Sequence, residues 1–320
     1  MSVPRLERDI LKSVSRSFYL SIRILPKEVR RPIGVAYLLA RTSDTIADTG
    51  SVPVSIRLDR LAEFESLLKG ESAPSAVASI QRDIQPPHPG ERALITALPG
   101  MLALFGRLDP WDLAETRVLM EKIIRAQSND LRAFPDPNRI VALQNAAELE
   151  EYTYLVAGCV GEWWTQTCFH HLPNYSRLPP GQAIELANSF GKALQLVNIL
   201  RDLRTDLEAG RCYLPADELA KHGARPEALR DHPELAEPVV DHWLARARQF
   251  LAEARTYISA VRIRRIQLAC YLPWRLAGKT LDLLDQQSPL RTRAKLKVSR
   301  SEVRSALWEG LRIAFVKRSL

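Results

Sequence analysis

Two pairs of aspartates share one spacing in this chain of 320 residues. Asp44 and Asp48 form the first pair, and Asp202 and Asp206 form the second. On an α-helix, residues four positions apart lie on one face, with Cβ atoms about 5–6 Å apart. Two carboxylates at that distance repel each other unless a cation lies between them. Each pair therefore predicts either a cation site or an exposed face with ordinary salt bridges, such as one between Arg41 and Asp44.

Each pair belongs to a polar column on an otherwise apolar helix. The flanking positions are mostly alanine, leucine, valine and isoleucine. A polar stripe on such a helix is costly unless it lines a cavity or meets solvent. The first column contains Tyr37, Arg41, Asp44 and Asp48, and the second contains Gln195, Asn198, Asp202 and Asp206, with Arg201 beside it.

Oxygen ligands without histidine or cysteine companions favour a hard cation. Mg²⁺ is usually bound through one or two protein carboxylates and completes its shell with waters and substrate phosphates, and Mn²⁺ accepts similar ligands. Arg41, Arg201 and Arg211 could supply forked donors to a diphosphate. The sequence therefore predicts a metal–diphosphate clamp. Its candidate metal ligands are Asp44, Asp48, Asn198, Asp202 and Asp206.

Helical periodicity dominates the elements that must position these columns. Alternating strand patterns are nearly absent, so we expect an all-α fold of about ten helices in one domain. The domain would have a core over residues 10–285 and a basic helical segment over residues 286–320. Four prolines within residues 72–89 predict a disordered loop there. The apolar stripes run over residues 56–68, 113–124, 183–207, 242–261 and 266–284.

The composition limits the classes of protein to which the chain can belong. Its formal net charge is +8, and its four cysteines show no metal-type spacing. No apolar stretch approaches the roughly 20 residues of a membrane-spanning helix, and a charged beginning predicts no export signal. No nucleic-acid-binding module accompanies the basic charge. We therefore expect a cytoplasmic protein that does not bind nucleic acid.

Five segments occur in the order typical of one family. They are SRSFY (15–19), YLLARTSDTIAD (37–48), YTYLVAGCVG (152–161), QLVNILRDLRTD (195–206) and GRCYLP (210–215). With these motifs the chain resembles the squalene/phytoene synthase family, the head-to-head trans-isoprenyl diphosphate synthases. The resemblance covers nearly the whole chain.

The resemblance implies an isoprenoid-synthase helical bundle around a deep apolar cavity. Gly158 and Gly161 would allow close approach of either a neighbouring helix or a substrate chain. The catalytic residues implied are Tyr154, Tyr152, Arg41, Asp44 and Asp202. The substrate-binding residues implied are Ser15, Arg16, Phe18, Tyr19, Tyr37, Arg41, Gln195, Asn198, Arg201, Arg211 and Tyr213.

The resemblance also implies a Mg²⁺-assisted reaction of isoprenyl diphosphates. We expect condensation of two farnesyl diphosphates through presqualene diphosphate to squalene, with hydride from NADPH. Thr45 favours this product, because phytoene synthases usually carry a second aspartate at that position of the motif. The alternatives are a phytoene synthase that condenses two geranylgeranyl diphosphates, and a non-catalytic family member that acts as an assembly factor.

A basic segment lies near the end of the chain. Its residues Lys295, Lys297 and Arg300 could hold a cofactor phosphate without a Rossmann fold, or could face anionic lipid. The second reading predicts peripheral contact with the inner face of a membrane. The substrate chain length and the oligomeric state are left open by the sequence.

Overall fold

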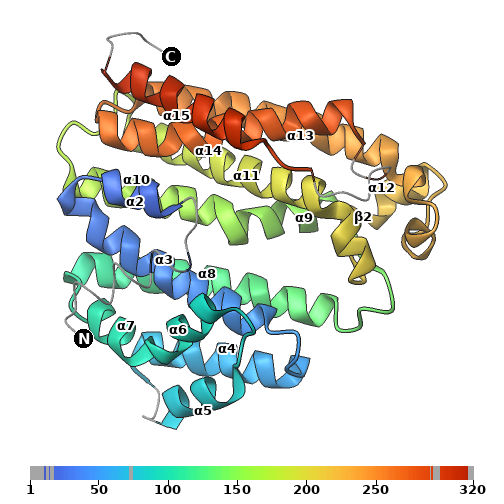
Figure 1. Cartoon of the computed structure of the whole chain (residues 1–320), viewed down its shortest axis with the longest axis horizontal. Coiled ribbons are helices and arrows are strands. Elements are labelled where there is room, and N and C mark those ends of the chain that lie inside the picture. Colours follow the sequence, from blue (N-terminus) through green and yellow to red (C-terminus); the bar gives the residue numbers. More distant parts are fainter. Residues whose placement is uncertain are drawn as a thin grey trace. The chain divides into compact units, whose positions relative to one another are not determined.

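The computed structural model describes residues 11, 14, 18–71, 75–288, 290 and 296–315. Over these residues the chain is almost entirely helical (Figure 1), which confirms the all-α prediction. Its internal contacts divide it into two compact units, Met1–Arg132 and Ala133–Leu320. The single-domain organisation and the deep apolar cavity stay predictions. None of the described helices is long and apolar enough to cross a membrane.

The first unit is built from helices alone in its described part. Prolines at positions 26 and 53 immediately precede α3 and α4, and Gly70 ends α4 in the left-handed conformation with φ of 80°. The helices are α2 (Phe18–Ile24), α3 (Lys27–Asp48), α4 (Val54–Lys69), α5 (Ser75–Asp83), α6 (Pro89–Thr96), α7 (Leu98–Phe105) and α8 (Pro110–Ala133).

Helix α5 corrects the prediction of a disordered loop over residues 72–89. Its residues Ala76 and Ile80 are four positions apart and both buried, so they form an apolar face against the rest of the unit. Proline clusters lie outside this stretch. Among the described residues within 72–89, only 84–88, between α5 and α6, are not helical.

The second unit centres on the long helix α11, which packs against α10, α13 and α14 (Figure 1). Buried leucine, isoleucine and valine side chains of α11 join those of α13 and α14 in one core. The main elements are β1 (Val141–Leu143), α9 (Ala146–Thr153), the π-helix η1 (Tyr154–Gly158), α10 (Cys159–His171), α11 (Pro180–Glu208) and β2 (Arg211–Pro215). They are followed by α12 (Ala216–Lys221), the 3₁₀ turns η2 (Pro226–Arg230) and η3 (Pro233–Ala236), α13 (Glu237–Ala260), α14 (Arg264–Gln286) and α15 (Arg300–Phe315).

A short parallel strand pair departs from the purely helical expectation. Strand β2 pairs with β1 in the register Val141 to Arg211 and Ala142 to Cys212. Gly210 precedes β2 with φ of 77°, and a Cβ there would lie 2.7 Å from the carbonyl oxygen of Asp136. The GRCYLP segment (210–215) thus begins at a position that requires glycine.

Helix α15 lies within the predicted basic segment and packs on α14. Glu309 accepts hydrogen bonds from Arg275 at 2.9 Å and from the Tyr271 hydroxyl at 3.2 Å. A Cβ on Gly310 would lie 2.7 Å from Leu268 Cδ1, so glycine allows the two helices to approach closely.

Candidate active site

The first polar column lies on the accessible side of α3. Asp44 is partly exposed and Asp48 is exposed, whereas Leu39 and Ile46 are completely buried. The helix therefore uses its apolar side for the core of the first unit. The complete column is Tyr37, Arg41, Asp44 and Asp48, as the sequence predicts.

Arg41 forms its shorter ion pair with Glu91, a residue outside the predicted column. Arg41 Nη2 lies 2.5 Å from Glu91 Oε1 of α6, whereas Arg41 Nη1 lies 3.8 Å from Asp44 Oδ2. Glu91 fixes the guanidinium more closely than the column aspartate does. Nothing in the local sequence links position 41 to position 91, since the contact depends on how α3 packs with α6.

The Asp44 carboxylate is desolvated by neighbouring protein atoms and lies near other charged groups. Desolvation, followed by the charge of Asp48, raises its pKa to about 6, although Arg41 and a hydrogen bond from Gln127 oppose the shift. Gln127 of α8 donates from Nε2 to Asp44 Oδ1 at 2.5 Å. Water still reaches 43% of the Asp44 side chain, so the group is crowded rather than enclosed. An incoming cation would relieve the repulsion between the two carboxylates.

Thr45 does not face the acidic column. Its hydroxyl donates to the backbone oxygen of Arg41 at 2.8 Å, and its side chain is buried. The hydroxyl therefore finds its hydrogen-bond acceptor within its own helix. The Thr45 side chain thus adds no polar group to the acidic column.

The second polar column, on α11, carries arginine partners. Arg201 binds Asp202 through two nitrogens, at 2.5 and 3.2 Å. Arg211 Nη2 of β2 donates to Asp206 Oδ1 at 2.7 Å. The side chain of Asp206 is only 12% exposed, so its arginine supplies most of the compensation that water would otherwise give.

The amides of this column lie nearer to solvent than Asp206. Asn198 is exposed, and its Nδ2 is 3.5 Å from Oε1 of Gln195. At that distance the hydrogen bond is weak. Both amides can therefore turn toward another partner at little cost.

The two tyrosines of the 152–161 motif have different surroundings. Tyr152 stacks on Tyr213 with ring centroids 4.7 Å apart, and Phe134 meets the same Tyr213 ring edge-on at 5.3 Å. Tyr213 is buried, so these contacts attach strand β2 to the end of α9. The predicted roles of Tyr152 and Tyr213 toward substrate stay predictions.

Tyr154 begins the π-helix η1 and belongs to a polar chain. Its hydroxyl donates to Glu162 Oε2 at 3.1 Å, and Asn188 Nδ2 donates to Glu162 Oε1 at 2.6 Å. A Cβ on Gly158 would lie 3.0 Å from Asn188 Oδ1 and 3.2 Å from Tyr154 Cδ2. Single π-helical turns often occur at functional sites. The motif thus combines a π-turn, a glycine and a hydrogen-bonded phenol.

Helix packing accounts for the other motif glycine. A Cβ on Gly161 would lie 2.0 Å from the carbonyl oxygen of Ala187 on α11. The sequence reading missed the reciprocal glycine, Gly191, where a Cβ would lie 2.1 Å from the carbonyl oxygen of Ala157. Two glycines on facing helices thus bring the backbones together, which favours the packing interpretation of Gly161.

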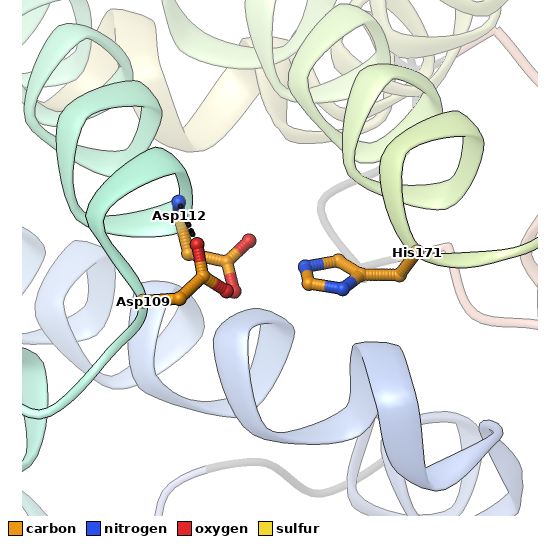
Figure 2. A group of neighbouring side chains, drawn as sticks. All are labelled: Asp109, Asp112 and His171. Atoms are coloured by element: carbon orange, nitrogen blue, oxygen red, sulfur yellow. Dashed lines mark hydrogen bonds between the residues drawn. The ribbon is translucent and has the colours of Figure 1, made fainter.

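Asp109 and Asp112 lie at the start of α8 (Figure 2). Asp109 Oδ1 accepts hydrogen bonds from the backbone nitrogens of Trp111 and Asp112, both at 3.0 Å, and so caps the helix. Asp112 is buried. His171, drawn in the same figure, is the last residue of α10 in the other unit. Helix capping explains Asp109 without a metal.

Several predicted site residues cannot be placed. Ser15, Arg16 and Lys295 lie outside the described residues. Phe18 and Tyr19 belong to α2, and Arg300 begins α15, but their side chains also lie outside the description. Lys297 is exposed.

The donors around Asp44 fit a hard cation. Asp44 and Asp48 offer carboxylate oxygens on an accessible helix face, and Gln127 Oε1 is a buried oxygen without a hydrogen-bond partner among the described residues. Buried polar atoms are normally satisfied, so an unpaired acceptor on the residue that binds Asp44 indicates a missing partner. Oxygen donors of this kind suit Mg²⁺ or Mn²⁺.

Comparisons with known proteins place these motifs in context. The model of the squalene/phytoene synthase family matches residues 11–302. Squalene synthase ERG9 of Saccharomyces cerevisiae is 25% identical over 280 residues, covering 86% of this chain and 60% of that protein. A bifunctional lycopene cyclase/phytoene synthase of Blakeslea trispora is 30% identical over 220 residues, covering 67% of this chain and 33% of that protein. The chain thus spans less than two thirds of the length of either relative.

A solved structure supports the fold. The complex of TcSQS with the ligand BPH1237 matches with a TM-score of 0.78 at 23% identity, over 96% of this chain and 86% of that one. The family match covers most of the chain and includes both aspartate columns, the tyrosine motif and strand β2. The chain belongs to the squalene/phytoene synthase family.

Proposed function

We propose that the chain is a transferase that condenses two farnesyl diphosphates head to head, through presqualene diphosphate, to squalene. The observation that carries the proposal is the pair of aspartate columns with one spacing, on α3 and on α11, in a chain of this family. The similarity to the yeast squalene synthase supports the choice of substrate.

The aspartate columns would hold the cation and the diphosphate. Asp44 and Asp48 on α3, and Asp202 and Asp206 with Asn198 on α11, would be the ligands. When bound, Mg²⁺ or Mn²⁺ neutralises charge on the diphosphate that leaves. Arginines next to the columns would donate to the same diphosphate, and their forked groups match its oxygens. They are Arg41, Arg201 and Arg211.

On α11 the arginines would have to change partners. Arg201 and Arg211 now bind Asp202 and Asp206. If the carboxylates held a cation, the two guanidinium groups could donate to the diphosphate instead. Tyr37 and Gln195 would complete the polar lining. From the segment before α3, the substrate would also be bound by Ser15, Arg16, Phe18 and Tyr19.

Tyr154 would act on the carbocation that follows ionisation. Its hydroxyl donates to Glu162 at 3.1 Å, which would hold the phenol ring in one orientation. An aromatic face can stabilise a nearby cation by about 0.5–2 kcal/mol. Tyr152 would contribute by holding Tyr213 and strand β2 in place.

Two alternative functions remain. One is synthesis of a different product, phytoene, and the other is a role without catalysis. Phytoene synthesis from geranylgeranyl diphosphate has specific support, because a curated relative that is 30% identical is a bifunctional lycopene cyclase/phytoene synthase. A non-catalytic assembly factor would not need the carboxylates of both columns.

Product analysis separates these possibilities. Purified protein with Mg²⁺ is incubated with farnesyl or geranylgeranyl diphosphate, each with and without NADPH. We expect presqualene diphosphate from the C15 substrate alone and squalene when NADPH is added. Phytoene from the C20 substrate without reductant would contradict the squalene assignment, and no product in any tube would favour the assembly factor.

We also propose a cytoplasmic location with peripheral contact with an anionic membrane, since the product is too apolar to leave into water. Trp308 on α15 is 69% exposed, and Arg304 and Arg312, four residues before and after it, are exposed as well. Each basic side chain near an anionic surface contributes about 1 kcal/mol. Flotation with liposomes should show salt-sensitive binding that Trp308→Ala weakens, and binding independent of anionic lipid would refute the contact.

A further inference from the structure

Gln127 contacts the acidic column of α3 without belonging to any of the five motifs. It lies on α8, within a helix whose other polar residues gave no functional signal in the sequence. Its Nε2 donates to Asp44 Oδ1 at 2.5 Å. Its Oε1 is buried and has no hydrogen-bond partner among the described residues.

The orientation of this amide follows from the chemistry of its neighbour. Ionised Asp44 can only accept hydrogen bonds, so the NH₂ group of Gln127 must face it. If the amide were turned around, its carbonyl oxygen would lie against the carboxylate and both would be left without a donor. Oε1 therefore points away from the Asp44 oxygen that Nε2 binds, and it needs a donor or a cation of its own.

We propose that Gln127 is a positioning residue of the cation site at Asp44 and Asp48. Its Nε2 fixes one oxygen of Asp44, and its Oε1 accepts a hydrogen bond from a water bound to the cation. The inference rests on the proposed function, because it assumes that these aspartates hold a metal ion.

The charge of the site explains why an amide is suited to this position. Asp44 and Asp48 already repel each other, and a third carboxylate would add to that repulsion whenever the cation is absent. An amide offers an acceptor oxygen without charge and donates to Asp44 at the same time. Partners of this kind orient metal ligands, and their removal typically lowers metal affinity 10- to 100-fold.

Binding of Mn²⁺ alone, followed by electron paramagnetic resonance, tests the role without relying on activity. We expect Asp44→Asn to abolish one class of Mn²⁺ binding and Gln127→Leu to weaken the same class about tenfold. Gln127→Glu should bind Mn²⁺ more tightly than Gln127→Leu, since it retains an acceptor oxygen, although it loses the Nε2 donor to Asp44. Gln81→Leu is the matched control: Gln81 donates to backbone oxygens of Ile95 and Thr96, and its loss should leave Mn²⁺ binding unchanged.

The outcomes separate this inference from the proposed function. Unchanged Mn²⁺ affinity in Gln127→Leu, with circular dichroism showing a folded protein, would overturn the role of Gln127 alone. Equal weakening in Gln127→Leu and Gln127→Glu would overturn the role proposed for Oε1 and would assign the effect to the lost Nε2 donor. A wild-type protein that binds no Mn²⁺ would overturn both the metal site and the inference built on it.

Discussion

The acidic columns of α3 and α11 have the same aspartate spacing but different electrostatic surroundings. On α3 the carboxylates repel each other, and the pKa of Asp44 rises to about 6. On α11 each aspartate already has an arginine, Arg201 for Asp202 and Arg211 for Asp206. The comparison teaches that a motif fixes which atoms share a face, whereas residues from other helices decide the charge that this face carries.

The largest expected effect tests whether both columns serve the reaction. Asp44→Asn and Asp202→Asn should each lower kcat by about 10³-fold or more, since each removes charge that stabilises the transition state through the cation. The measurement is turnover of farnesyl diphosphate, with circular dichroism to show that the helices remain. If one variant keeps full turnover, its column does not take part.

A smaller effect should appear in the arginine pairs of α11. Arg211→Gln leaves Asp206, whose side chain is only 12% exposed, without its closest cation. We expect the free energy of unfolding to fall by about 1–2 kcal/mol at pH 7. Urea denaturation measures the loss, and Arg211→Lys is the control that retains the charge. No loss in Arg211→Gln would mean that the pair is not a stabilising contact.

The smallest effect distinguishes the columns by the sign of a stability change. The folded state raises the pKa of Asp44 from 3.8 to about 6, so it binds the proton more tightly than the unfolded chain does. The contribution of Asp44 to stability therefore falls as the pH rises through that window. In EDTA, Asp44→Asn should gain roughly 1 kcal/mol above pH 6, after allowance for solvent screening, and the gain should disappear below about pH 4.

Asp202→Asn is the matched comparison for this measurement. Its carboxylate accepts two hydrogen bonds from Arg201, so its neutralisation removes a favourable pair rather than a repulsion. We expect no gain in stability at pH 7. Thermal unfolding across pH measures both variants, and an equal gain in the two would remove the electrostatic distinction between the columns.

The sequence predicted the columns well because helical geometry alone brings residues at steps of three and four onto one face. Asp44 and Asp48 lie as expected, and the apolar residues between them are buried. The partners of the columns could not be predicted in this way. Glu91 and Gln127 reach α3 from α6 and α8, across separations of 50 and 83 residues.

Several local contacts in the structure could not be predicted from the sequence. Thr45 follows Asp44 directly, yet its hydroxyl bonds to the backbone oxygen of Arg41 in the preceding turn of its own helix. Prolines near α5 suggested a loop, yet Ala76 and Ile80 supply enough buried contact for a helix. The hydrogen bond from Asn188 to Glu162 depended on packing between α10 and α11 and had no sequence signal.

Release of inorganic diphosphate from farnesyl diphosphate tests the central claim most directly. The account predicts release by the wild-type protein that requires Mg²⁺, stops when EDTA is added, resumes when excess Mg²⁺ is restored, and is lost in Asp44→Asn and in Asp202→Asn. Full release in EDTA, or release at the wild-type rate by both variants, would contradict the assignment of the two aspartate columns to the ionisation of the substrate.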